Sequence, residues 1–123
     1  MIRIATNEEA LELYNQPEIV ERVGVFAESF YYQPWVAMSG DAKMLFVFWV
    51  VDPGTVEVHI AQPRKYLKHS RELCFKIIHW LFQLGAKRII TDCPPGKIAN
   101  LARKVGMTEY KSDPDTVYFE VKL

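Results

Sequence analysis

The chain has 123 residues, of which half are hydrophobic and 24% are charged, and its 15 Lys and Arg balance its 15 Asp and Glu. This length predicts a single domain over residues 1–123, and the composition excludes an intrinsically disordered chain. The zero net charge argues against a nucleic-acid partner. The longest apolar run, MLFVFWVV at residues 44–51, is too short to cross a bilayer, and the N-terminus lacks a secretory pattern. We therefore expect a cytoplasmic protein without a membrane partner.

The first 40 residues predict a strand, two helices and the start of a second strand. IRIA at residues 2–5 is typical of a short strand, and TNEEALELYNQ at residues 6–16 predicts a helix with Thr6 or Asn7 as its N-cap. Pro17 fits the first turn of a second helix through residues 18–26, because its missing N–H needs no partner there. The aromatic-rich stretch at residues 30–40 then leads into a strand.

The middle of the chain predicts a hairpin in the centre of a sheet, followed by a long helix. KMLFVFWVVD at residues 43–52 is too continuously apolar for a surface strand, and the turn DPGT places Gly54 for a positive φ, so TVEVHIAQ at residues 55–62 should return antiparallel. From Ser70 the apolar spacing changes to three and four, which predicts a helix that Ser70 caps and Gly85 ends.

The last third predicts a strand, a short helix and a final hairpin. KRIITDC at residues 87–93 is typical of a buried strand, and residues 94–106 of a helix closed by Gly106. MTEYKSD at residues 107–113 and TVYFEVKL at residues 116–123 are strands joined by DPD. Cys74 and Cys93 have no paired spacing, which predicts free thiols and no metal site.

The resulting order, β-α-α-β-β-β-α-β-α-β-β, resembles the GNAT family of acetyl-CoA-dependent N-acetyltransferases. AKRI at residues 86–89 opens the strand after the long helix, and NLARKVGM at residues 100–107 is similar to the helix ending LYEKLGF of that family. With EVHIA at 57–61 and WLFQLGAKRIITDCPP at 80–95, these segments most resemble small GNAT-like proteins of phages and prophages. The resemblance implies an α/β (α+β) acyl-CoA N-acyltransferase fold, whose mixed, mostly antiparallel sheet has about seven strands with about four helices.

The same resemblance implies that acetyl-CoA binds as a co-substrate at the loop after the fourth strand. In this chain Lys68 stands where the family has the first glycine of its pyrophosphate loop. Two interpretations remain: either a helix N-terminus and basic side chains bind the pyrophosphate, or the loop is an ordinary solvated start of a helix. The residues expected to bind the cofactor are Ile60, Ala61, Arg64, Lys65, Lys68, His69, Ser70 and Asn100.

Glu57 and His59 are the candidate catalytic residues. They lie two apart in a strand and so project from one face. A carboxylate or an imidazole can take a proton from an attacking amine, and the fourth strand of the family commonly supplies such a base. The alternative is that both lie on a half-exposed face or pair with basic neighbours. The Tyr that often acts as an acid in the family is replaced by Ala102; Tyr66, Tyr110 or water could substitute, and the sequence selects none of them.

The segment ESFYYQPW, residues 28–35, matches the region where the family places its acceptor wall. Tyr31, Tyr32 and Trp35 could line this wall, form a patch for a partner protein, or close the core.

Two functions of different classes follow. The first is an N-acetyltransferase of phage or prophage origin that binds acetyl-CoA between strands 55–62 and 87–92 and acts on a primary amine, with no metal. The second is a non-catalytic GNAT-fold phage protein acting in virion assembly or host interaction, which the missing glycines and the missing Tyr favour. The acceptor is not identified. A homodimer, in which TVYFEVKL could pair between two copies, stays open.

Overall fold

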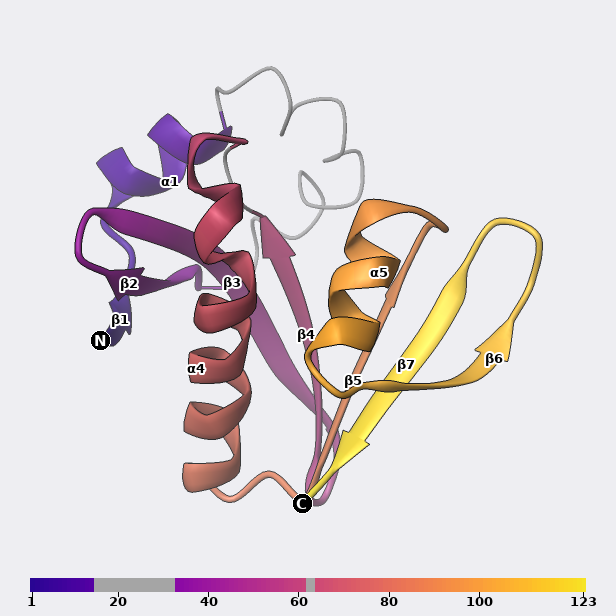
Figure 1. Ribbon diagram of the computed structural model, residues 1–123. Helices are drawn as coiled ribbons and strands as arrows, with labels where there is room; N and C mark the ends of the chain where they lie inside the picture. The colour runs from indigo at the N-terminus through magenta and orange to yellow at the C-terminus, as the bar shows by residue number, and fades with distance from the viewer. Residues whose placement is uncertain (15–32, 62–63) are drawn as a thin grey trace.

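The computed structural model describes residues 1–14, 33–61 and 64–123 (Figure 1). The predicted second helix, residues 17–26, lies outside the described residues. The described elements, in chain order, are β1 (Ile2–Ile4), α1 (Asn7–Tyr14), β2 (Trp35–Ser39), β3 (Ala42–Asp52), β4 (Thr55–Ala61), the 3₁₀ helix η2 (Arg64–His69), α4 (Ser70–Gln83), β5 (Arg88–Cys93), α5 (Lys97–Lys104), β6 (Thr108–Ser112) and β7 (Val117–Lys122).

The strands form one seven-stranded sheet in the order β1-β2-β3-β4-β5-β7-β6. β4 and β5 pair in parallel, and every other neighbouring pair is antiparallel. This confirms the predicted mixed, mostly antiparallel sheet with the β3–β4 hairpin near its centre. The terminal strand, which the sequence left open for pairing between two copies, has no free edge: β7 lies between β5 and β6 and is paired on both sides.

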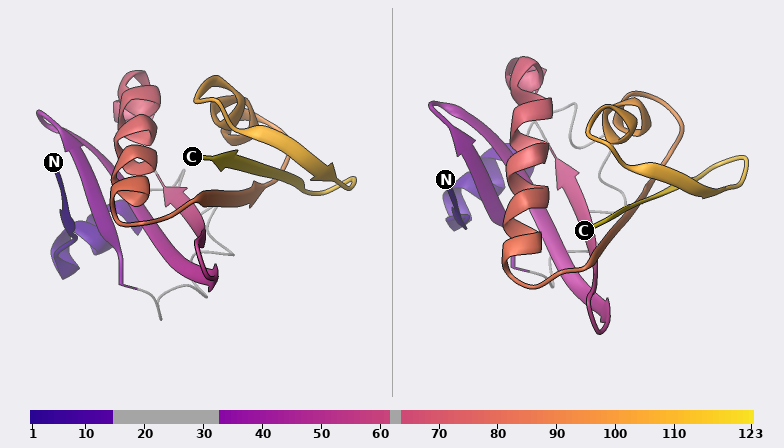
Figure 2. Two further views of the ribbon diagram at one scale, coloured as in Figure 1. Left: turned by 90° about the horizontal axis from the view of Figure 1, so that it is seen from below. Right: turned by 60° about the horizontal axis from the view of Figure 1, so that its bottom comes forward.

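Both faces of the sheet are covered. α4 and α5 lie on one face and α1 on the other (Figure 2). The side chains of β3 alternate between the two: Met44 and Phe46 pack in the core beneath α4 and α5, while Leu45 and Val47 pack with Ala10 of α1. This double burial explains why the sequence of β3 is apolar without interruption.

The ends of α1 and α4 are formed in different ways. Thr6 caps α1 through a capping box, since its hydroxyl accepts a hydrogen bond from the Glu9 N–H and its own N–H donates to the Glu9 carboxylate. Ser70 does not cap α4, contrary to the prediction. It is the first residue of that helix, and His69 occupies the N-cap position without a side-chain hydrogen bond, because η2 runs directly into α4. Gly85, with φ at 115°, follows α4 as predicted.

Among the described residues, no helix combines the length and the apolar composition that crossing a bilayer requires.

Candidate functional site

β4 and β5 pair over only three positions and then part. Their partners are Thr55 with Arg88, Val56 with Ile89 and Glu57 with Ile90. Beyond this point β4 runs on to Ala61 and β5 to Cys93 without pairing with each other. The sheet therefore has a split in its middle, between two strands that are each paired on their other side.

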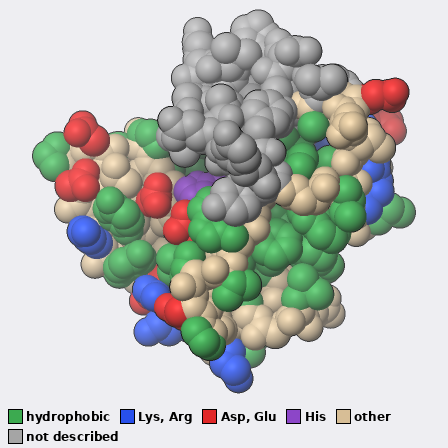
Figure 3. Space-filling view, turned by 180° about the vertical axis from the view of Figure 1, so that it is seen from behind, with side chains coloured by type: hydrophobic (Ala, Val, Ile, Leu, Met, Phe, Trp, Pro, Cys, Tyr) green, Lys and Arg blue, Asp and Glu red, His purple; other side chains and the backbone are tan. Residues whose placement is uncertain are grey.

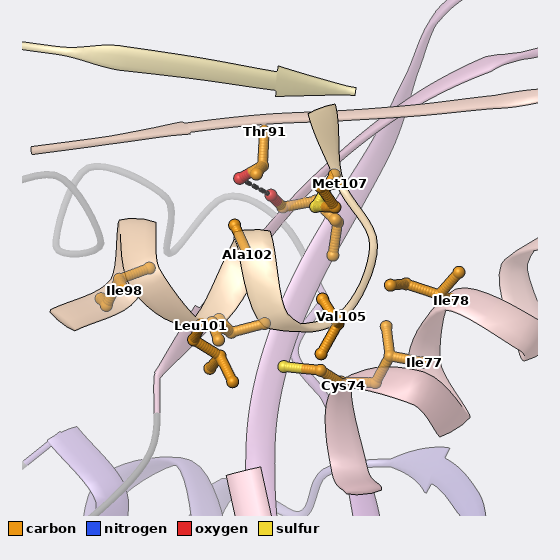
Figure 4. Close-up of a pocket in the computed structure, with 11 residues that line it drawn as sticks. Cys74, Ile77, Ile78, Thr91, Ile98, Leu101, Ala102, Val105 and Met107 are labelled. Carbon is orange, nitrogen blue, oxygen red and sulfur yellow. Dashed lines mark hydrogen bonds between the residues drawn. The ribbon is translucent and has the colours of Figure 1, made fainter. Parts of the chain in front are cut away.

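The Thr91 side chain bridges the split at its narrow end. The Thr91 hydroxyl donates a 2.6 Å hydrogen bond to the carbonyl oxygen of Val58 (Figure 4). The Val58 carbonyl therefore faces the split, and a hydroxyl replaces the backbone N–H that would bind it in a continued ladder.

An apolar groove lies on the α4 and α5 side of the split. Figure 4 shows side chains of α4 and α5 converging on the two parted strands. Ala102 of α5 lies in this groove, so nothing at that position offers a phenol. The residues that line the groove are Val58, Ile60, Cys74, Ile77, Ile78, Thr91, Ile98, Leu101, Ala102, Val105 and Met107.

Both thiols are held in their protonated form. Burial raises the pKa of the Cys74 thiol to about 12. Burial first, and the nearby Asp92 carboxylate second, raise the pKa of Cys93 to about 11. Since the thiolate is the reactive species, neither cysteine suits nucleophilic catalysis near neutral pH.

A polar cluster lies on the opposite face of the same two strands. Glu57 and His59 project from that face, as predicted, and are joined by a 2.7 Å hydrogen bond between Glu57 Oε2 and His59 Nε2. Asp92 of β5 joins them: one ligand-type atom from each of the three side chains lies within 4.8 Å of the others. The Trp49 ring stacks on the imidazole of His59, with ring centroids 5.3 Å apart and planes at 24°. The cluster is half-buried.

Sequence reasoning missed Asp92, and the register explains why. Glu57 faces Ile90 in the last paired position, so His59 and Asp92 each lie two residues beyond it and point to the same side. No local pattern in the sequence carries this register.

Figure 3 shows the molecule from behind, on the side opposite to the view of Figure 1. Acidic side chains border a histidine on this surface.

The basic loop forms the helix η2 and the exposed side of α4. Because η2 continues into α4, the first N–H groups of α4 follow helical residues and do not open onto solvent as an isolated helix N-terminus would. The side chains of Arg64 and Lys65 lie outside the described part of the structure. Lys68 borders a shallow depression on α4 with Arg71 and Phe75.

The remaining residues assigned to the cofactor or the acceptor are spread over the molecule. His69 Nδ1 lies 3.7 Å from Glu72 Oε2. Asn100 accepts a 3.1 Å hydrogen bond from Arg103 on the exposed side of α5. Ile60 lines the apolar groove, whereas the Ala61 side chain packs in the core on the α1 face.

Of the three aromatic residues that the sequence assigned to the acceptor wall, the structure describes one, Trp35. Tyr31 and Tyr32 lie outside the described residues. Trp35 packs beneath α4, with its ring centroid 5.0 Å from Trp80 and 6.0 Å from Phe48. Core closure, the third alternative for Trp35, is thus the observed one. Trp49 of β3 packs against the core on the α1 face and also stacks on His59 of the polar cluster.

No family model matches this chain, and no curated protein matches its sequence. Solved structures do match. A Bacillus subtilis acetyltransferase in complex with CoA has a TM-score of 0.69 at 20% identity, covering 99% of this chain and 97% of that one. The protein has the GNAT fold. The Campylobacter jejuni N-acetyltransferase PseH in complex with acetyl coenzyme A has a TM-score of 0.68 at 15% identity, covering 99% of both chains. The aminoglycoside acetyltransferase AAC(6')-Ib in complex with ribostamycin and coenzyme A has a TM-score of 0.75 at 16% identity, covering 99% of this chain and 92% of that one.

This GNAT fold accounts for the split in the sheet. The fold joins a parallel β4–β5 pair to antiparallel neighbours on both sides, so the two strands are free to part where their pairing ends. The apolar groove and the polar cluster then lie back to back on the same unpaired segments.

Proposed function

We propose that the protein is an acetyl-CoA-dependent N-acetyltransferase that acylates a primary amine. The observation that carries the proposal is the split between β4 and β5, with an apolar groove on one side and a carboxylate and imidazole pair on the other. The solved structures of this fold named above hold CoA or acetyl-CoA, which supports the same co-substrate here.

The groove suits the pantetheine part of acetyl-CoA. Its walls are apolar, and the strand edge beyond Val58 carries backbone groups that β5 does not pair, so an extended chain with amide groups can add along this edge. Lys68 and His69 of the helical segment that follows β4 would bind the pyrophosphate, because cationic donors form strong hydrogen bonds with phosphate. Arg64, Lys65 and Ser70, the other residues that the sequence assigns to this role, belong to the same stretch of the chain. The bound thioester supplies the activated acetyl group.

Glu57 and His59 supply the base. An acceptor arrives as an ammonium ion, and its nitrogen must lose a proton before it can attack the thioester carbon. The hydrogen-bonded pair takes that proton, and the nitrogen attacks the thioester carbon to form the new C–N bond. The C–S bond breaks, and the second proton that the nitrogen loses passes to the departing thiolate, which leaves as the thiol. Trp49, stacked on His59, holds the imidazole against Glu57. Raised pKa values at Cys74 and Cys93 favour this direct attack over an acetylated cysteine.

Binding of acetyl-CoA is the first test. A ligand at about 100 times its dissociation constant stabilises a protein by about 2.7 kcal/mol, so titration should raise the melting temperature by several degrees. No shift at millimolar acetyl-CoA would instead favour the non-catalytic alternative, which rests on Lys68 at a glycine position and Ala102 at the Tyr position.

Three further points remain predictions from the sequence: phage or prophage origin, a cytoplasmic location and a possible homodimer.

Turnover is the second test. Glu57→Gln and His59→Ala should each lower kcat by about 10² to 10⁴, the usual contribution of a general base, while leaving the acetyl-CoA thermal shift nearly unchanged. Release of the CoA thiol measures the rate. Glu8→Gln, an exposed acid in the first turn of α1, serves as the control and should match the wild type. A loss of acetyl-CoA binding in either site variant would show that the pair is structural.

A further inference from the structure

The contact between Thr91 and Val58 closes the split where β4 and β5 stop pairing. The last paired residues are Glu57 and Ile90, and Val58 and Thr91 are the next residue of each strand. The Thr91 hydroxyl donates its 2.6 Å hydrogen bond to the Val58 carbonyl oxygen at this point. Both side chains also line the apolar groove (Figure 4). Their contact therefore forms the end of the groove at the narrow end of the split.

Chain direction orients an acyl-CoA in this groove. β4 and β5 run parallel and part toward Ala61 and Cys93, at the end of the sheet where α4 begins (Figure 1). Lys68 and His69, the residues that we assign to the pyrophosphate, come directly before α4 and so belong to this wide end. The pantetheine then runs along the groove from the wide end, and the thioester is the part of the molecule nearest to the narrow end.

The candidate base places the reacting carbon beside Val58. Glu57 and His59, joined by their 2.7 Å hydrogen bond, are the residues on either side of Val58 in β4. A nitrogen that gives its proton to this pair attacks a carbon close to the same position. The acyl chain leaves that carbon on the side away from the sulphur. It therefore points toward the closed end of the split and meets the Thr91 side chain.

We propose that Thr91 is a specificity-determining residue that restricts the acyl donor to acetyl-CoA. An acetyl group ends in one methyl, whereas propionyl and butyryl groups place one and two further carbons against Thr91. The narrow end cannot widen without breaking the hydrogen bond to Val58, which would leave the carbonyl of a buried residue without a partner. This inference rests on the proposed function, since it assigns the length of the acyl group at the same site.

Binding of acetyl-, propionyl- and butyryl-CoA in the absence of an acceptor amine provides the test. Isothermal titration should show that the wild type binds propionyl-CoA about tenfold more weakly than acetyl-CoA, and butyryl-CoA more weakly still, because one extra methylene in a fitted apolar pocket has an effect of this size. Thr91→Ala removes the hydroxyl and the methyl, and should reduce the difference between acetyl- and propionyl-CoA to about threefold or less.

Three further variants complete the series. Thr91→Val has nearly the same volume as the wild type and should keep the preference for acetyl-CoA. Thr91→Ser loses only the methyl and should relax the preference in part, so it decides the matter if Thr91→Ala does not fold. Thr108→Ala, at an exposed position of β6, is the control and should bind as the wild type does.

Turnover separates this inference from the proposed function. If the three thioesters bind in the expected order but no primary amine causes release of the CoA thiol, the N-acetyltransferase function fails and the selection by Thr91 stands. Equal affinity of the wild type for all three would overturn the inference and leave the function intact. A preference that survives in Thr91→Ala, or one that is lost in Thr91→Val, would also overturn it. The absence of binding by any of the three would overturn both.

Discussion

At the scale of single residues, the Glu9 carboxylate has three described partners on separate parts of the chain. Its carboxylate accepts hydrogen bonds from both terminal nitrogens of Arg3, at 2.5 and 2.8 Å, and from the Thr6 N–H at 3.1 Å. Lys43 Nζ of β3 lies 3.2 Å away. The hydrogen bonds from Arg3, before any other cause, hold the pKa of Glu9 far below its usual range. One side chain thus links β1, α1 and β3.

This predicts acid sensitivity. A carboxyl group whose pKa is depressed by folding stabilises the protein fully above its unfolded pKa, about 4.3, and progressively less as the pH falls below that value toward the folded pKa. Glu9→Gln should lower the free energy of unfolding at pH 7 by about 1.5 to 3 kcal/mol, the usual range for charged hydrogen bonds, and should flatten its decline between pH 5 and pH 3. Urea unfolding at several pH values measures both effects, and Glu8→Gln is the control. Parallel pH curves for Glu9→Gln and the wild type would contradict this account.

Local signals in the sequence predicted residues whose partners lie nearby in the chain. Thr6 was one of two candidates for the first cap, and the acid three positions later completes the capping box. Glu57 and His59 share a face because strand alternation requires it. Asp92 could not be found in this way, since its position opposite His59 depends on how two strands that are distant in the chain align.

At the scale of elements, the β4–β5 pair depends on few interactions. The two strands share three paired positions, and the next link is the hydrogen bond from the Thr91 hydroxyl to the Val58 carbonyl. A buried carbonyl that loses its partner costs about 1 to 3 kcal/mol. The Thr91 side chain therefore has two roles: its hydroxyl stabilises the contact between β4 and β5 where their pairing ends, and it lines the groove.

Substitution of Thr91 tests this support. Thr91→Val keeps the shape of the side chain and removes the hydroxyl, so we expect the free energy of unfolding to fall by about 1 to 2 kcal/mol. Thr91→Ser retains the hydroxyl and should recover most of the loss attributable to the hydrogen bond. Chemical denaturation of the three proteins provides the comparison. Equal stability of Thr91→Val and the wild type would mean that water satisfies the Val58 carbonyl.

Most elements followed from periodicity, and the two failures have a common physical cause. The β3–β4 hairpin, α4 and α5 have strong local patterns and turn residues. The sequence contains no signal that η2 precedes α4 and displaces Ser70 from the cap. It also does not show that β7 lies between β5 and β6, so that β6 is the edge strand. Both depend on tertiary contacts, which decide where a helix begins and in which order strands pair.

At the scale of the whole molecule, the groove requires that α5 approach the split without filling it. Small side chains make this approach possible: Ala99 and Ala102 are the buried residues of α5. Ala102 faces the groove that we assign to acetyl-CoA. A larger side chain here would occupy the space of the pantetheine.

Ala102→Met should therefore weaken acetyl-CoA binding by at least about tenfold, while the fold tolerates the flexible side chain at a cost of about 1 to 3 kcal/mol. Isothermal titration measures the affinity, and circular dichroism verifies the fold. Lys104→Met on the exposed side of the same helix is the matched control and should bind as the wild type does. Unchanged affinity in Ala102→Met would place acetyl-CoA elsewhere.

β6 is an edge strand of the sheet, and its shape disfavours the addition of another strand. Every residue of β6 is exposed, and its register with β7 shifts between Glu109 and Lys111. An irregular strand with a lysine beside its bulge is a poor template for a strand from another molecule, because the added strand would meet a bent row of donors and a charge. The described sheet is thereby protected from the addition of a strand from another molecule at this edge, and a straightened β6 would lose this protection.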